Sequence, residues 1–262
     1  GFGAWGIGGL TENITSYGPT DDRESGKALL HAFDAGINFY DTANIYGNGH
    51  SEELIGKTFG GNRNKIIIAT KAGFFKHRGE QDFSPKNLRQ SLEGSLGRLN
   101  SDYVDLYQLH SPPIELIEQN IDEIKGTMEQ LITEGKIKSY GISLRSPNDG
   151  ITAIRLGFPV LQTNFNLIDQ RALDNGLFPL AKKNKTGIIA RTPLGFGFLT
   201  GKYDYKKLDK SDHRTAYSEE QLKLWNDAPT LFKELAQKIE GTLAQFALRF
   251  CLAQNAIDTI IQ

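Results

Sequence analysis

The sequence has little cysteine, no long apolar run and no excess of either charge. Its single cysteine, Cys251, excludes an internal disulfide, and a reducing, cytoplasmic setting is the expected one. No apolar run approaches the ~18 residues that cross a bilayer, and no signal peptide is visible, so we expect no membrane partner. With 30 Lys and Arg against 31 Asp and Glu, the sequence lacks the basic excess that nucleic acid binding requires.

Metal-binding patterns are also absent from the sequence. The five histidines show no paired His-x-x-x-His spacing, which is the usual signature of a zinc enzyme, so we expect no metal site. The hydrophobic content of 39% and the charged content of 23% are typical of a globular protein. A chain of 262 residues is long for one ordinary domain, but α/β barrels reach this length as a single domain.

Short apolar segments alternate with amphipathic ones along nearly the whole chain. The predicted strands lie within residues 2–6, 37–43, 65–73, 102–110, 137–143, 159–166, 186–195 and 256–262. An eightfold β/α repeat closes best as an α/β (β/α)8 TIM barrel, here a single domain over residues 1–262. A doubly wound open sheet is the alternative. It usually has a Gly-rich turn that leads directly into a helix, whereas here the glycines overlap the first strand and the next helix begins near Asp21.

Three helices are indicated most clearly. One begins after the N-cap Ser84 with Pro85 in its first turn, and its apolar stripe is Leu88, Leu92, Leu96 and Leu99. A second is predicted to run unbroken to Gly135, with one apolar face formed by Ile117, Ile121, Ile124, Met128, Leu131 and Ile132. A last long helix places Cys251 on its apolar face, so this cysteine is predicted to be a packed thiol and not a nucleophile.

Ionisable side chains stand at or just after the ends of three consecutive predicted strands. Asp41, Lys71 and His110 end the second, third and fourth strands, and Tyr46 follows in a loop. Taken singly, each has a structural explanation as a turn former, an ion-pair partner, a hydrogen-bonded group or a packing residue. Because the carboxyl ends of barrel strands meet at one rim, with neighbouring strands about 4.8 Å apart, we predict that the four side chains lie together.

Proton donation to a carbonyl under reduction is the chemistry that these four groups can perform. A tyrosine ordinarily titrates at about pH 10, and an ammonium such as that of Lys71 stabilises the tyrosine anion. Asp41 would hold Lys71 in place, and His110 would orient the substrate oxygen. The set suits the alkoxide that develops as hydride reaches a carbonyl carbon. A cofactor must supply that hydride, since no amino acid can.

Segments over nearly the whole chain resemble the aldo-keto reductase superfamily and occur in the same order as in that family. They are more similar to its bacterial and plant-type branch than to its mammalian aldose reductase branch. They read FGAWGIGG, GINFYDTANIYGNGHSEELIGK, IIIATKAG, SLGRLNSDYVDLYQLHSP, IKSYGIS, LQTNFNLID, RTPLGFGFLTGKY and LAQFALRFCLA followed by IDTII. The resemblance implies a barrel enzyme that reversibly reduces an aldehyde or ketone to the alcohol with NAD(P)H. It makes Tyr46 the general acid of a catalytic tetrad whose other members are Asp41, Lys71 and His110.

The resemblance also implies a set of cofactor contacts. Ser143 and Gln162 match the residues that hold the nicotinamide carboxamide in the family. The further contacts that it implies are Gly3, Ala4, Trp5, Asp41, Arg191, Pro193, Leu194, Gly197, Gly201 and Lys202. Arg191 stands where many relatives stack an aromatic ring on the nicotinamide, and Leu144 stands where the family often has Asn. The N-terminal hairpin and the C-terminal segment that grips adenosine and the 2′-phosphate are expected to be missing, so NADPH is predicted by family habit and NADH is not excluded.

Two other functions are compatible with the same residues. Lys71 would act as a Schiff-base nucleophile in an aldolase, although an adjacent Asp41 would keep the amine protonated. The chain would also suit an NADPH-binding regulatory or partner-binding module with little turnover, as potassium-channel β subunits are. The expected ligand is a small carbonyl compound, whose pocket rim we predict to include Trp5, Phe74, Phe75 and the loop near Tyr203. The sequence indicates neither the particular substrate nor the oligomeric state.

Overall fold

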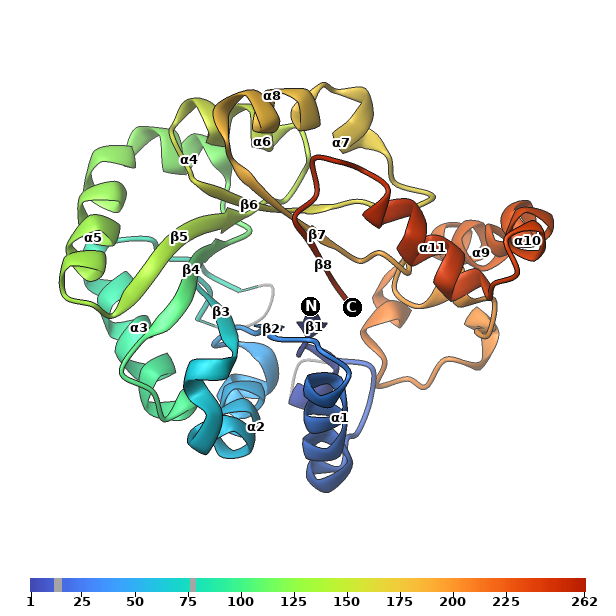
Figure 1. Ribbon diagram of the computed structural model, residues 1–262, viewed down its shortest axis with the longest axis horizontal. Coiled ribbons are helices and arrows are strands. Elements are labelled where there is room, and N and C mark those ends of the chain that lie inside the picture. Colours follow the sequence, from blue (N-terminus) through green and yellow to red (C-terminus); the bar gives the residue numbers. More distant parts are fainter. Residues whose placement is uncertain (12–15, 76–78) are drawn as a thin grey trace.

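The computed structural model describes residues 1–11, 16–75 and 79–262. Over these ranges eight strands form one sheet, and each pairs in parallel with the next along the chain. Figure 1 shows the strands as a ring with the helices outside it. The strands are β1 (Phe2–Gly3), β2 (Phe39–Asp41), β3 (Ile67–Ala72), β4 (Val104–His110), β5 (Ile137–Ser143), β6 (Val160–Asn164), β7 (Gly187–Arg191) and β8 (Thr259–Ile261).

Backbone hydrogen bonds join the first strand to the last. The Gly3 amide donates to the Gln262 carbonyl over 2.7 Å, and the Gln262 amide donates to the Gly1 carbonyl over 3.4 Å. The sheet therefore closes almost completely, and the predicted (β/α)8 barrel is confirmed. The first strand is shorter than predicted because the chain turns into a 3₁₀ helix (Gly6–Gly8) directly after Trp5.

Helices follow the strands around the outside of the barrel. They are α1 (Asp22–Asp34), α2 (His50–Phe59), α3 (Pro85–Leu99), α4 (Ile114–Gln119), α5 (Ile121–Thr133), α6 (Asp149–Arg155), α7 (Arg171–Asp174), α8 (Leu177–Asn184), α9 (Glu219–Asp227), α10 (Pro229–Lys238) and α11 (Leu243–Leu252). The start predicted for α3 is confirmed, since the Ser84 side chain accepts a hydrogen bond from the Asn87 amide and Pro85 lies in the first turn. The four leucines of its stripe are buried.

One helix prediction was wrong. The segment expected to run unbroken to Gly135 divides into α4 and α5 at Asn120. Asn120 has φ −119° and ψ 19°, and its side-chain amide donates to the Leu116 carbonyl over 2.8 Å, so it satisfies a carbonyl at the end of α4 and ends that helix. Ile132, which was placed on the buried face, is 39% exposed.

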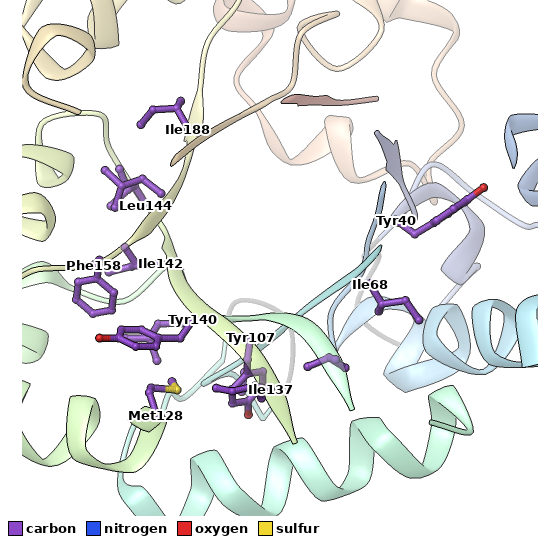
Figure 2. Packing of buried hydrophobic residues seen from close by; sticks show 14 of the residues in the cluster. Tyr40, Ile68, Tyr107, Met128, Ile137, Tyr140, Ile142, Leu144, Phe158 and Ile188 are labelled. Atoms are coloured by element: carbon purple, nitrogen blue, oxygen red, sulfur yellow. The ribbon is translucent and has the colours of Figure 1, made fainter. Parts of the chain in front are cut away.

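The main hydrophobic core lies between the strands and the surrounding helices. Alternate residues of each strand point outward into it, and Figure 2 shows several of them, including Tyr107, Tyr140, Ile142 and Ile188. Cys251 of α11 is fully buried in this core, and burial raises the pKa of its thiol to about 12. The prediction of a packed thiol is confirmed. The inward-pointing residues of the same strands are left to build the site.

The loop that begins near Tyr203 and leads to α9 folds into short turns beside the N-terminal segment. It contains 3₁₀ helices at Tyr205–Lys207 and His213–Ala216, and the His213 amide donates to the Ser16 carbonyl over 2.8 Å. Within the described part of the chain, no helix combines the length and the apolar character needed to cross a membrane.

Candidate active site

Lys71 is the centre of the group of side chains at the carboxyl ends of the strands. Its side chain is fully buried, and its Nζ pairs with the Asp41 carboxylate. The same Nζ donates to the Thr42 carbonyl over 2.8 Å and to the phenolic oxygen of Tyr46 over 3.1 Å. Parallel pairing sets β2 next to β3, with Asp41 opposite Ala69. Asp41, Lys71 and Tyr46 therefore meet as expected.

The electrostatics of Lys71 are set by two opposing effects. Burial of the ammonium away from water lowers its pKa, while the charge of Asp41, the Tyr46 phenol and the hydrogen bonds to both raise it. The pKa of Lys71 is raised on balance. An ammonium held in this way stays charged at neutral pH and faces the Tyr46 oxygen with a fixed positive charge.

The loop that carries Tyr46 is fixed by glycines. Gly47 has φ 60° and packs so closely on Gly8 that a Cβ on Gly47 would lie 2.0 Å from the Gly8 carbonyl oxygen. Gly49 has φ 97°, and a Cβ there would lie 2.4 Å from Cδ of Arg98. Only glycine fits both the left-handed backbone and these contacts. The Tyr46 backbone is thereby held between the N-terminal 3₁₀ helix and α3.

His110 ends β4 and faces Tyr46 from the neighbouring side. The two ring centroids are 5.8 Å apart, edge to face, and the ring of Phe74 lies 5.2 Å from that of His110. The His110 backbone carbonyl accepts a hydrogen bond of 2.8 Å from the Gln81 side chain. All four residues of the predicted tetrad thus come to one place from β2, β3, β4 and the loop after β2.

Two amide side chains hold the second oxygen of the Asp41 carboxylate. Gln162 donates to Asp41 Oδ2 over 2.7 Å, and Gln108 donates to the same oxygen over 3.2 Å. The Ser143 hydroxyl donates to Gln162 Oε1 over 3.2 Å. Gln162 and Ser143 were expected near a cofactor amide, whereas Gln108 was missed. Its position two residues before His110 on one strand was the available signal, because strand alternation points both side chains inward.

A cavity of about 540 Å³ opens beside these groups. Of the residues singled out in the sequence, its wall includes Gly3, Trp5, Asp41, Tyr46, His110, Gln162, Arg191, Pro193, Leu194 and Gly197. Five of the predicted site residues are not part of that wall, namely Ala4, Lys71, Ser143, Gly201 and Lys202. Lys71 is buried behind it. Ala4 is fully buried, and its amide donates to the Asp41 carbonyl over 2.8 Å. Lys202 is exposed.

The rest of the cavity wall is largely aromatic. Trp5, Phe74 and Tyr203 line it as expected, but Phe75 does not, and this residue is 61% exposed. Tyr17, Phe196 and Tyr217 also line the cavity and were missed. They lie on loops whose packing depends on long-range contacts, which local sequence patterns do not encode.

Arg191 ends β7 and contributes a positive charge to the cavity wall. Its Nη2 donates to the Leu144 carbonyl over 2.8 Å. Burial lowers the pKa of its guanidinium, an effect that the charges of Tyr46 and Asp41 oppose. The chain then bends through unusual backbone angles, with φ 57° at Thr192 and φ 54° at Phe196. Such angles are strained for bulky residues, and strain of this kind is concentrated at functional sites.

The tripeptide Asp212–Arg214 lies behind the wall and connects the loop after β7 with the N-terminal segment. Arg214 and Asp212 form a buried, bidentate ion pair, and Arg214 Nη1 donates to the Phe196 carbonyl over 3.0 Å. The guanidinium lies 4.3 Å from the ring centroid of Tyr203. These contacts fix one side of the cavity. Within the described ranges, no three acidic, histidine or cysteine side chains gather as a metal-binding group.

The sequence model of the aldo/keto reductase family matches residues 1–262. The chain belongs to that family. It is 33% identical to the aldo-keto reductase YhdN of Bacillus subtilis, with 98% of this chain and 78% of YhdN covered. It is 31% identical to the NADP(+)-linked aldo-keto reductase yakc of Schizosaccharomyces pombe, with 97% and 76% covered.

A solved structure has the same fold as this aldo/keto reductase. The glycerol dehydrogenase AKR11B4 from Gluconobacter oxydans superposes with a TM-score of 0.79 at 29% identity, with 99% of this chain and 80% of that chain covered. Family membership makes the chain an oxidoreductase of the class that reduces small carbonyl compounds, and nicotinamide cofactors are those that the family uses.

Proposed function

We propose that this aldo/keto reductase reduces an aldehyde or ketone to the alcohol with NAD(P)H as the hydride donor. The observation that carries the proposal is the contact of 3.1 Å between the buried Lys71 ammonium and the Tyr46 phenol at the mouth of a cavity. An acid placed beside a fixed cation is suited to protonate the oxygen that becomes an alkoxide.

Each of the four central residues has a separate task in this reaction. Tyr46 gives its proton to the substrate oxygen, and Lys71 stabilises the phenolate that is left. Asp41 keeps Lys71 charged and in place, since the two form a buried ion pair. The His110 ring, edge-on to Tyr46, orients the substrate oxygen toward the phenol. In the reverse direction the same groups accept the alcohol proton.

The cavity fits a nicotinamide by size and by donor set. Its volume of about 540 Å³ lies in the range of cofactor sites. Gln162 of β6 lines the cavity, and the Ser143 hydroxyl at the end of β5 donates to Gln162 Oε1 from behind the wall, so Gln162 and Ser143 would hold the carboxamide. The reduced nicotinamide, when bound, supplies the hydride. Planar Arg191 and the backbone of Gly3 and Trp5 would flank it.

The loop after β7 would hold the rest of the cofactor. Pro193, Leu194 and Gly197 line the same cavity, and their loop begins at Arg191. The exposed Lys202 and its neighbour Gly201 would contact the part of the cofactor farther from the nicotinamide. Ala4 would contribute only through its backbone. NADPH is the proposed form, a choice favoured by the NADP(+)-linked relative yakc.

The decisive experiment counts turnovers. The chain is mixed with NADPH and, in turn, a panel of aldehydes and ketones such as 4-nitrobenzaldehyde, and the absorbance of the reduced nicotinamide is followed. We expect many equivalents of NADPH to be consumed per chain. Consumption of about one equivalent would instead favour a cofactor-binding regulatory module. A borohydride-trapped adduct on Lys71 would favour the aldolase alternative.

A further inference from the structure

The inward layer of side chains around Asp41 is unusual for a parallel barrel. Inward positions of such barrels are mostly branched apolar residues, and a buried amide is unfavourable unless its hydrogen bonds are made. Here Asp41 of β2, Gln108 of β4 and Gln162 of β6 are all inward and all buried. These three side chains come from alternate strands and satisfy one another.

The side chain of Gln108 forms hydrogen bonds with both other members of this layer. It is fully buried and is not part of the cavity wall. Its Nε2 donates to Asp41 Oδ2 over 3.2 Å, and its Oε1 accepts a longer hydrogen bond of 3.4 Å from Gln162 Nε2. Register sets Gln108 directly beside Lys71 on the adjacent strand. A bound carbonyl compound would therefore not contact Gln108.

We propose that Gln108 is a positioning residue for proton transfer, an inference that rests on the proposed reductase function. Two donors on Oδ2 of Asp41, from Gln108 and Gln162, fix the plane of the carboxylate. Its other oxygen, Oδ1, then faces Lys71. Lys71 in turn is held against the Tyr46 oxygen. The amide of Gln108 thus acts on the acid through two intermediates and never touches the reacting atoms.

The test compares two changes at one position with a packing control on the same strand. Gln108→Met keeps the length of the side chain but removes the donor and the acceptor. Gln108→Glu keeps the shape but presents a carboxyl to Asp41. Leu106→Met alters a buried inward residue two positions earlier, which packs with Ala69, Ile189 and Ile261 and makes no polar contact with its side chain. Each variant is prepared as the full chain and checked by thermal unfolding.

We expect Gln108→Met to lower kcat for the carbonyl by about tenfold, the usual worth of one hydrogen bond to a charged group. KM should change less than kcat, because the side chain does not reach the cavity. Leu106→Met should keep both kcat and its dependence on pH.

Gln108→Glu should regain activity relative to the wild type when the pH is lowered. At neutral pH its carboxylate repels Asp41, so kcat falls. As pH falls, the new carboxyl takes up a proton and donates again, so the ratio of its kcat to that of the wild type should rise.

Three outcomes decide the matter. A lower kcat with little change in KM for Gln108→Met, together with acid recovery of kcat in Gln108→Glu, supports the inference. If the wild type is active and both Gln108 variants match Leu106→Met in rate and in pH dependence, the role proposed for Gln108 is overturned. The proposed reductase function is then unaffected. A folded wild-type chain that turns over no carbonyl compound in the panel overturns both.

Discussion

At the scale of single residues, the site is built around one buried cation with three oxygen partners. Lys71 has no exposed side-chain surface, and Asp41 is 3% exposed at its side chain. A pair buried in this way stabilises the fold only while both members are present, since removal of one leaves an uncompensated charge. The function and the stability of the barrel therefore depend on the same contact.

The proposed chemistry requires the hydroxyl group of Tyr46. We predict that Tyr46→Phe lowers kcat by a factor on the order of 10² to 10⁴, the usual worth of a general acid, while NADPH binding measured by calorimetry stays the same. Tyr217→Phe, which removes another phenol from the cavity wall, is the control and should keep most of the rate. Full turnover by Tyr46→Phe would remove tyrosine from its assigned role.

Lys71→Met should reveal the charge of the ammonium in the pH dependence of stability. Loss of one partner of a buried ion pair typically costs about 3–5 kcal/mol in the free energy of unfolding. The pKa of Lys71 is raised above its ordinary value, so its contribution is fully present below about pH 10 and is lost as the pH rises through the folded-state pKa.

Urea unfolding of wild type and Lys71→Met over a series of pH values measures this difference. The gap between the two should be constant from neutral pH to about pH 10 and should narrow above it. Lys138→Met, which removes a largely exposed partner of Asp105, should give a much smaller gap. A gap that narrowed toward acid pH, and not toward alkali, would contradict the assignment.

At the scale of elements, the contact between two 3₁₀ helices positions the acid. Gly8 ends the helix Gly6–Gly8, and Gly47 lies in the helix Tyr46–Gly49. We predict that Gly47→Ala lowers both stability and kcat, because its Cβ would overlap the Gly8 carbonyl and Tyr46 is the adjacent residue.

The matched control for that change is a glycine in open space. Gly126 lies within α5, and a Cβ there would meet nothing within 4 Å. Gly126→Ala should stabilise the chain by about 0.5–1 kcal/mol and leave kcat unchanged. Urea unfolding and steady-state rates measure both variants. If Gly47→Ala were as active as Gly126→Ala, the close contact would not be what sets the position of Tyr46.

Elements and their order were predictable because periodicity is a local property of sequence. The strand ends at Asp41 and His110, and the start of α3 at Pro85, agree with the structure. The break at Asn120 was missed, since it depends on one side chain that bonds to its own helix. Gln108 was missed for another reason. Glutamine within a strand suggests exposure, so its position two residues before His110 was not interpreted as burial against Asp41.

At the scale of the whole molecule, barrel closure is what gathers the site. The four tetrad residues, which lie between positions 41 and 110, converge because their strands are neighbours in one ring. That convergence was predictable from the alternation of strands and helices in the sequence. The cavity walls did not follow from it. Tyr17, Phe196 and Tyr217 come from loops that are joined by the Asp212–Arg214 pair, and such contacts between distant segments carry no periodic signal.

Cofactor preference should appear as a change in the stability of the whole chain. A ligand that binds only the folded state, at 100 times its Kd, adds about 2.7 kcal/mol, which is a rise in Tm of roughly 5–10 °C for a chain of this size. We predict that NADPH raises Tm more than NADH at equal concentration. Scanning calorimetry measures both, and Tyr46→Phe should show the same rise. An equal or larger effect of NADH would reverse the proposed preference.

The two tryptophans lie in places that make the protein its own optical sensor. Trp5 lines the cavity, with its ring 6.1 Å from that of Tyr46. Trp225 stands behind the wall, 4.8 Å from Tyr217 and 5.3 Å from Phe196. Since the sequence has only these two tryptophans, the intrinsic emission of the chain comes almost wholly from one indole in the cavity wall and one behind it. Energy transfer from indole to a dihydronicotinamide would then report occupancy in unlabelled protein, in real time.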